Sequence, residues 1–171
     1  NLNFGWFKGD TVNIGVGQGY LSATPIQLAY YASFLAKKGN LNKLSFVKNS
    51  VDPKVETFKA TNIIDTDWQK LHDSMIGVIE NPKGTAKRLR NLKNYIIAAK
   101  SGTVELVSTD TKEDYKIVRE VEGKRDHAII VAFGPMPNPK YAVSVIIENG
   151  ESGGSVAGPV AIKVLNSLLK K

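Results

Sequence analysis

Four consecutive residues near the middle of the chain, Lys100-Ser101-Gly102-Thr103, carry groups that could act together chemically. They interrupt an apolar run, residues 96–106, that is typical of a buried strand. In a strand, Ser101 and Thr103 share one face, and Gly102 leaves the other face open to a ligand or another backbone. An ammonium, two hydroxyls and the free N–H groups of a strand edge suit a peptide carboxylate. The pattern therefore indicates a site where a peptide substrate could add to a sheet edge.

A purely structural interpretation of this motif is also open. The alkyl stem of Lys100 could cover apolar surface while its ammonium stays in water. Gly102 argues against it, because glycine weakens a strand unless something must approach closely. Glu105, two residues after Thr103, could also take part in catalysis, but strand alternation can equally turn it outward.

The composition limits the classes of protein to consider. The 171 residues suit one domain or part of a larger one, and 42% hydrophobic with 23% charged residues predicts a folded chain. The absence of cysteine excludes disulfides and thiolate metal sites. No apolar run approaches the ~20 residues that span a bilayer. The first residue is Asn1 rather than Met, which suggests a processed or trimmed product.

The net charge of +7 favours acidic partners. The densest basic run, residues 83–93, has almost no interleaved aromatic residues, and no nucleic-acid module is recognisable. We interpret it as a solvated loop and expect no nucleic-acid partner. The run "GVGQGY" fails as a dinucleotide fingerprint, because the third glycine is replaced by Tyr20. A loop with close backbone approaches is expected over residues 1–23.

Two helices are predicted in the first half of the chain. Thr24 caps the first, Pro25 suits its first position, Gln27 completes a capping box, and Gly39 ends it. The second helix is predicted from about residue 66 to 80 and would begin with a second capping box. Its cap would be Thr66 with Gln69, and its buried stripe Trp68, Leu71, Met75 and Ile79. Residues 40–64 are expected to be irregular.

The second half is predicted to consist mainly of strands. They are residues 94–106, the alternating segment 115–123, and the apolar segments 127–133 and 141–148, the last two joined by a turn-rich connection. A last helix follows a glycine-rich break. Along it, apolar residues step by four at Val156, Val160, Val164 and Leu168. This order predicts an α/β fold of the α+β type, an antiparallel sheet with helices on its faces.

The four residues at 100–103 resemble the third motif of penicillin-binding proteins and serine β-lactamases. Residues 9–29, "GTAKRL" followed by "AAKSGT", and residues 125–150 resemble corresponding segments of class B penicillin-binding proteins. The segments "GQGYL", "RDH" and "ENG" resemble the elongation-specific, rod-shape class B penicillin-binding proteins more than the division-specific ones. The resemblance covers almost the whole chain and is weakest over residues 41–64 and 107–122. It implies the penicillin-binding fold.

Two of the three family motifs are not found in their expected form. The chain contains no Ser-x-Asn, and Ser-x-x-Lys occurs only at Ser45 to Lys48 and Ser167 to Lys170. A nucleophilic serine belongs at a helix N-terminus, where amide groups stabilise an oxyanion. Neither serine fits that position, so we interpret both as chance matches. Residues 1–171 are therefore predicted to be the C-terminal part of a transpeptidase domain, and the nucleophile, its lysine base and the middle motif are expected to precede this chain.

The resemblance implies acyl transfer between peptidoglycan stem peptides through a serine acyl-enzyme, and acylation by β-lactam antibiotics. It implies that Lys100 and Thr103 act in catalysis, Lys100 through its charge or a proton relay and Thr103 through a backbone N–H that is one of two oxyanion donors. Ser101, Gly102 and Thr103 would bind substrate: the hydroxyls hold a carboxylate, and the glycine admits the substrate strand. No metal or cofactor is expected.

The resemblance also implies partners and a location. The partners would be the N-terminal half of the same protein, a rod-shape scaffold protein and a polymerising glycosyltransferase of the SEDS type. The site would face the periplasm from the inner membrane, with the anchor outside this chain. Two alternatives remain: a β-lactamase or β-lactam-sensing domain, and a non-catalytic interaction module of the same fold.

Three other titratable residues are candidates for a functional site. His72, near the apolar stripe of the second helix, is expected to be a satisfied core or boundary histidine. Asp126 and His127 could form an orienting pair, but adjacent strand residues face opposite ways. Two histidines without cysteine make a weak zinc site.

Overall fold

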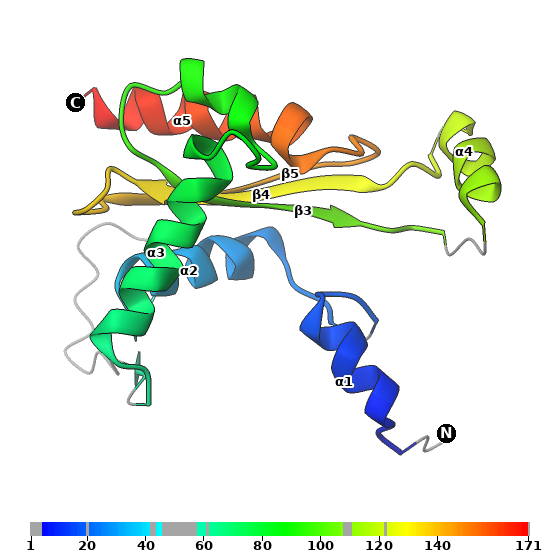
Figure 1. Ribbon diagram of the computed structural model, residues 1–171, viewed down its shortest axis with the longest axis horizontal. Helices are drawn as coiled ribbons and strands as arrows, with labels where there is room; N and C mark the ends of the chain where they lie inside the picture. The colour runs from blue at the N-terminus through cyan, green and yellow to red at the C-terminus, as the bar shows by residue number, and fades with distance from the viewer. Residues whose placement is uncertain are drawn as a thin grey trace.

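The computed structural model describes residues 5–19, 21–41, 44–45, 58–60, 62–107, 111–121 and 123–170. Its centre is an antiparallel sheet of three strands in the order β3-β4-β5, seen nearly edge-on in Figure 1. The strands are β3 (Ala98–Val104), β4 (His127–Gly134) and β5 (Tyr141–Ile147). This confirms the predicted antiparallel sheet. The β4–β5 connection is closed by a hydrogen bond of 2.9 Å from the Lys140 N–H to the Gly134 carbonyl.

Helices cover both faces of the sheet (Figure 1). One face carries α5 (Gly158–Leu169), the π-helical turn η2 (Gly153–Ala157) and the 3-10 turn η1 (Lys87–Asn91). The opposite face carries α2 (Pro25–Ala36) and the first part of α3 (Asp65–Glu80). Strand alternation divides the core accordingly. On the α5 side lie Ile97, Ala99, Ala128, Ile130 and Ala132, and on the α2 side lie Ala98 and Phe133.

Helix α3 passes from one face of the sheet to the other near the beginning of β3. Its residues Trp68 and Met75 belong to the core on the α2 side, whereas Ile79 belongs to the core on the α5 side. The chain that leaves α3 therefore lies on the α5 side, where it continues into η1. This path positions residues 81–86 beside the motif strand β3.

The first predicted helix is confirmed with its cap. The Thr24 side chain accepts the Gln27 N–H at 3.3 Å, and the Gln27 side chain accepts the Thr24 N–H at 2.8 Å. Gly39 follows the helix with a φ of +81°, which glycine adopts without strain. A Cβ at this glycine would also lie 2.6 Å from the Trp68 ring, so the end of α2 packs directly on α3.

The predicted capping box of the second helix is wrong. Helix α3 begins at Asp65, Ile64 is its N-cap, and no side chain caps it. Thr66 therefore lies inside the first turn, and Gln69 donates instead to Asp73 at 2.9 Å. The buried stripe is confirmed, since Trp68, Met75 and Ile79 are all buried and Leu71 is half-buried.

The strand predicted over residues 115–123 is a helix, α4 (Lys112–Glu120). Thr111 caps it by accepting the Asp114 N–H at 3.1 Å. The two half-buried apolar side chains, Tyr115 and Val118, are three residues apart, which is the spacing of one helix face. The alternation that suggested a strand was coincidental, because a pattern over so few residues does not separate the two periods.

The N-terminal region is more regular than the sequence suggested. Residues 8–15 form helix α1 (Lys8–Gly15), and the Asp10 carboxylate accepts the Phe7 N–H at 2.8 Å at its beginning. Close backbone approaches were expected for the glycines here, but Gly19 alone has a neighbour within 4 Å of a notional Cβ. Two short strands, β1 (Asn40–Leu41) and β2 (Phe58–Lys59), pair in the segment predicted to be irregular. Residues 46–57, also predicted to be irregular, lie outside the described residues.

The apolar residues that step by four along the last helix face outward. Val156, Val160, Val164 and Leu168 are 36–43% exposed, whereas Ala157, Ala161, Ile162 and Leu165 are buried against the sheet. The buried face is thus made partly of small residues that bring α5 close to the strands. In the part of the chain that the structure describes, no helix is both long and apolar enough to cross a bilayer.

Candidate active site

The motif lies within β3 and divides its side chains between the two faces as the sequence predicts. Ala99 faces α5, so Ser101 and Thr103 face the same way, and Lys100 and Gly102 face the side of α2 and α3. Contacts support this: the Ser101 and Thr85 hydroxyls lie 2.8 Å apart, and the Thr103 hydroxyl donates to the Glu151 carbonyl at 3.3 Å.

β3 is an edge strand, because among the described residues it pairs only with β4. The Gln18 side-chain amide donates to the Thr103 carbonyl at 3.3 Å from outside the sheet. The N–H and C=O of one residue in an antiparallel strand point to the same side. The Thr103 N–H therefore also points to the free edge, where a ligand could accept its hydrogen bond.

Lys100 lines an open cavity of about 610 Å³ beside this edge. Its exposed ammonium donates to the Ser101 carbonyl at 2.6 Å. The opposite wall of the cavity comes from α3 and from the segment that follows it, including Lys83 and Thr85. Glu105 is exposed just beyond the end of β3. The motif thus places a cation in the cavity, two hydroxyls on the other face of the strand and an outward N–H at its edge.

Sequence reasoning missed three residues that contact the motif: Thr85, Gln18 and Glu151. Thr85 belongs to the "GTAKRL" segment that was noted only for its spacing. Gln18 lies between Gly17 and Gly19, whose φ values are +81° and +73°, so the glycines turn the chain that carries it to β3. These glycines were the available signal for Gln18. No sequence pattern pointed to Glu151.

Glu151 connects β3, β4 and α4. Its N–H donates to the Asp126 carbonyl at 2.8 Å, and its carboxylate accepts two hydrogen bonds from Arg119 at 2.8 and 2.7 Å. Its φ is +60°, in the left-handed region. The Tyr115 hydroxyl donates to the buried Asp126 carboxylate at 2.5 Å, and this bond raises the pKa of Tyr115. Polar contacts therefore hold helix α4 against the sheet, and they involve Glu151, whose carbonyl accepts the hydrogen bond of the Thr103 hydroxyl.

The Arg119 hydrogen bonds hold the pKa of Glu151 below its ordinary value of 4.5. A carboxyl group whose pKa is lower in the folded than in the unfolded protein stabilises the fold at pH values above its unfolded-state pKa. This contribution to the free energy of unfolding is lost as the pH falls through the folded-state pKa. We expect Glu151→Gln to lower the melting temperature at neutral pH. The difference from the unsubstituted protein should shrink as pH falls below 4.5 and, because both groups are partly exposed, as salt rises.

Thermal unfolding between about pH 3 and pH 7 measures this difference. Glu120→Gln, which removes an exposed carboxylate of α4 next to Arg119, is the matched control and should change the melting temperature little at any pH. An equal destabilisation by Glu151→Gln at both ends of the range would contradict the ion-pair interpretation.

His72 and the Asp126–His127 pair have structural partners. His72 is 3% exposed, its Nε2 lies 2.8 Å from the Leu35 carbonyl, and its ring packs against Phe133, which confirms the core assignment. Asp126 binds Tyr115, whereas His127 Nδ1 accepts the Asn149 N–H at 3.1 Å. Asp126 and His127 thus have different partners. Among the described residues, no cluster of three His, Cys, Asp or Glu side chains could hold a metal.

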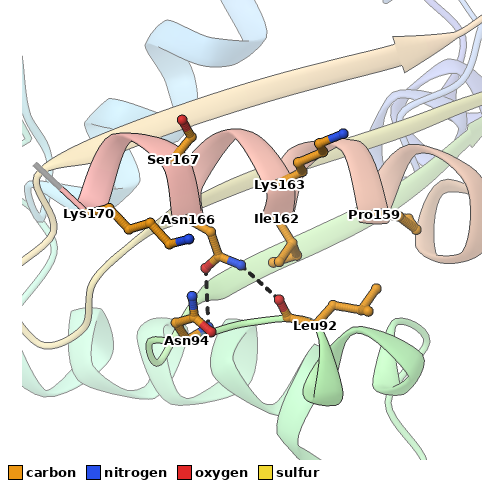
Figure 2. A pocket seen from close by; sticks show the side chains of 8 residues that line it. All are labelled: Leu92, Asn94, Pro159, Ile162, Lys163, Asn166, Ser167 and Lys170. Carbon is orange, nitrogen blue, oxygen red and sulfur yellow. Dashed lines mark hydrogen bonds between the residues drawn. The ribbon is translucent and has the colours of Figure 1, made fainter.

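The two Ser-x-x-Lys matches do not look like nucleophile sites. Ser45 is exposed, and Lys48 lies outside the described residues. Ser167 lines a groove of about 520 Å³ between α5 and residues 92–94, closed on one side by the hydrogen bonds of Asn166 (Figure 2). In that view the Ser167 hydroxyl and the Lys170 amine lie on opposite sides of the helix ribbon. Ser167 is also near the C-terminal end of α5. The motif lies beside η2, which precedes the N-terminal end of α5, so Ser167 and the motif are at opposite ends of the helix.

Comparison with known proteins defines the family to which this geometry belongs. Residues 1–166 match the family model described as the penicillin binding protein transpeptidase domain. The chain therefore belongs to the penicillin-binding protein transpeptidase family.

Curated relatives narrow the resemblance. The chain is 33% identical to the peptidoglycan D,D-transpeptidase MrdA of Haemophilus influenzae over 97% of its own length, and 33% identical to MrdA of Escherichia coli K12 over 96%. It is 36% identical to MrdA of Acinetobacter baumannii over 89%. It spans 27%, 27% and 23% of these three proteins, about a quarter of each.

Solved structures agree with the sequence comparison. The structure of Pseudomonas aeruginosa PBP2 in complex with WCK 5153 matches with a TM-score of 0.76 and 34% identity, over 97% of this chain and 34% of that one. The complex between PBP2 and MreC from Helicobacter pylori matches with a TM-score of 0.80 and 30% identity, over 98% and 29%. The predicted penicillin-binding fold and the resemblance to the elongation-specific type are confirmed.

Proposed function

We propose that the complete protein containing this chain is a peptidoglycan D,D-transpeptidase, and that residues 1–171 are the C-terminal part of its transpeptidase domain. The observation that carries the proposal is the placement of the motif. The motif lies on an edge strand, Lys100 lines an open cavity beside that strand, and the Thr103 N–H and C=O point outward. The family membership and the MrdA relatives support the same reaction.

The proposed reaction proceeds in two balanced steps through a serine outside residues 1–171. The serine attacks the carbonyl carbon of the penultimate D-Ala of a stem peptide and gives its proton to a base. The tetrahedral intermediate collapses to an acyl ester, and the terminal D-Ala leaves with a proton on its new amine. An amine of a neighbouring stem peptide then attacks the ester and gives a proton to the base, the serine oxygen leaves and takes a proton back, and the cross-linking amide is formed.

The motif residues have distinct roles in this proposal. Lys100 supplies positive charge at the cavity and takes part in proton relay or carboxylate attraction. The Ser101 and Thr103 hydroxyls bind the terminal carboxylate, and the outward N–H of Thr103 is one oxyanion donor. Gly102 lets the substrate strand approach, because no side chain projects from that position.

Labelling with fluorescent penicillin tests the proposed function. The complete protein should keep the label through denaturation, because an acyl-enzyme is covalent. Rapid release of hydrolysed penicillin would instead favour a β-lactamase. No label at all would favour a non-catalytic module and would overturn the proposal. Loss of rod shape on depletion of the protein would separate a transpeptidase from a β-lactam sensor.

The proposed partners follow from the same assignment. One structural relative is a PBP2 in complex with MreC, which supports a rod-shape scaffold protein as a partner here. A SEDS-type glycosyltransferase would supply the polymerised glycan strands that carry the stem peptides. The proposed location is the periplasmic face of the inner membrane, where this substrate is found.

A further inference from the structure

The segment between α3 and η1 contributes one hydroxyl to the motif strand. We propose that Thr85 is a positioning residue that directs the Ser101 hydroxyl toward the substrate carboxylate, an inference that rests on the proposed function. The two oxygen atoms lie 2.8 Å apart, although the residues are on different elements and 16 positions apart in sequence.

Close packing on both sides fixes the position of Thr85. On the α3 side, a Cβ at Gly84 would lie 2.3 Å from the Val78 carbonyl oxygen, so only glycine fits between the segment and the helix. On the η2 side, a Cβ at Gly154 would lie 2.5 Å from the Thr85 carbonyl oxygen. The next residue, Ala86, is 1% exposed, and its N–H donates to the Val78 carbonyl at 3.0 Å.

The motif strand is held equally closely against η2. A Cβ at Gly153 would lie 2.0 Å from the Ile129 carbonyl oxygen and 2.7 Å from the Gly102 carbonyl oxygen. Turn η2 therefore lies between the backbone that carries Thr85 and the backbone of β3. Three glycines, Gly84, Gly153 and Gly154, let α3, η2 and β3 approach without intervening side chains, and the Thr85 hydroxyl meets Ser101 at this junction.

The number of hydroxyl protons determines which of Thr85 and Ser101 donates the hydrogen bond between them when a carboxylate is bound. A serine hydroxyl has one proton and can donate one hydrogen bond. When Ser101 donates to the carboxylate, the bond within the pair must be donated by Thr85 and accepted by the Ser101 oxygen. Accepting this bond makes the Ser101 O–H a stronger donor and holds its rotamer. The Thr85 hydroxyl acts through Ser101 and needs no contact with the substrate.

The test compares Thr85→Val and Thr85→Ser in the complete protein. Valine keeps the branched shape of threonine without its hydroxyl, and Thr85 is exposed, so both variants should fold. Thr85→Val should lower the second-order rate constant of acylation by benzylpenicillin about 3- to 10-fold, within the range for loss of one neutral hydrogen bond. Thr85→Ser should stay within about twofold of the unsubstituted protein, because the hydroxyl is restored.

Two further measurements separate positioning from a structural role. In a Ser101→Ala background, Thr85→Val should have no further effect, since the hydroxyl it positions is gone. With the methyl ester of benzylpenicillin, which lacks the carboxylate, the effect of Thr85→Val should also disappear. Equal losses in both backgrounds, or equal losses with acid and ester, would overturn the role of Thr85. If the unsubstituted protein were not acylated at all, the proposed function itself would fail.

Discussion

Lys100→Ala in the complete protein should lower the rate of acylation by β-lactams by about 100- to 1,000-fold, the loss typical of removing one preorganised charge-stabilising group. The lysine projects from the edge strand into an open cavity, on the face opposite the two hydroxyls. In the complete protein we expect this cavity to be narrowed by the elements that bring the nucleophile. A positive charge in such a partly desolvated site acts more strongly than in water.

Stopped-flow acylation or competition against fluorescent penicillin measures this effect. Lys83→Ala is the matched control, because Lys83 lines the same cavity from the segment after α3. A general effect of positive charge would make the two substitutions similar. A specific role requires Lys83→Ala to stay within about threefold of the unsubstituted protein, since screened charges contribute little. Near-normal acylation of Lys100→Ala would remove this lysine from the site.

Thr103→Val should lower affinity or acylation about 10- to 150-fold, because a hydrogen bond to a charged group is worth roughly 1.5–3 kcal/mol. Valine keeps the β-branched shape that strands favour and the backbone N–H, so only the hydroxyl is removed. In the structure this hydroxyl donates to the Glu151 carbonyl at 3.3 Å. It must turn to the carboxylate when substrate binds.

The expected pattern for Thr103 is a large loss of acylation with a small change in melting temperature. Thr103→Ser retains the hydroxyl and should recover most of the activity. A marked fall in melting temperature together with unchanged acylation would show that Thr103 supports the fold rather than the carboxylate.

The parts of the fold that could be predicted are those set by local rules. The first helix has its cap and its proline within one short segment, and both act as expected, while the helix ends at Ala36 and both Lys38 and Gly39 adopt positive φ. The two apolar strands β4 and β5 are joined by a turn-rich connection and pair directly. The motif could be assigned to an edge strand because the alternation of hydroxyls and glycine is itself a local pattern.

The errors arose where packing between distant segments decides the structure. The alternation over residues 115–123 predicted a strand, but Thr111 caps a helix whose contacts are the polar ones of Tyr115 and Arg119. Along η2 and α5, the apolar residues that step by four face outward, while Ala157, Ala161, Ile162 and Leu165 face the sheet. A sequence shows which residues are apolar, but not which apolar face a sheet will cover.

The candidate site shows the same division. Lys100, Ser101 and Thr103 could be predicted as site residues because they are contiguous. Thr85 and Glu151 contact the motif across 16 and 48 positions of sequence, so only the folded chain shows them. Neither residue has an unusual local pattern: Thr85 follows a glycine that packs against α3, and Glu151 itself adopts a left-handed backbone.

The central claim is that this chain supplies the third motif of a serine acyl-transfer site whose nucleophile lies outside residues 1–171. Mapping the penicillin adduct tests it most directly. The complete protein is acylated, digested with protease, and the labelled peptide is identified by mass spectrometry, with Lys100→Ala treated in parallel. We predict a single labelled serine outside residues 1–171 and far less label in Lys100→Ala. A label on Ser45, Ser101 or Ser167 would contradict the claim.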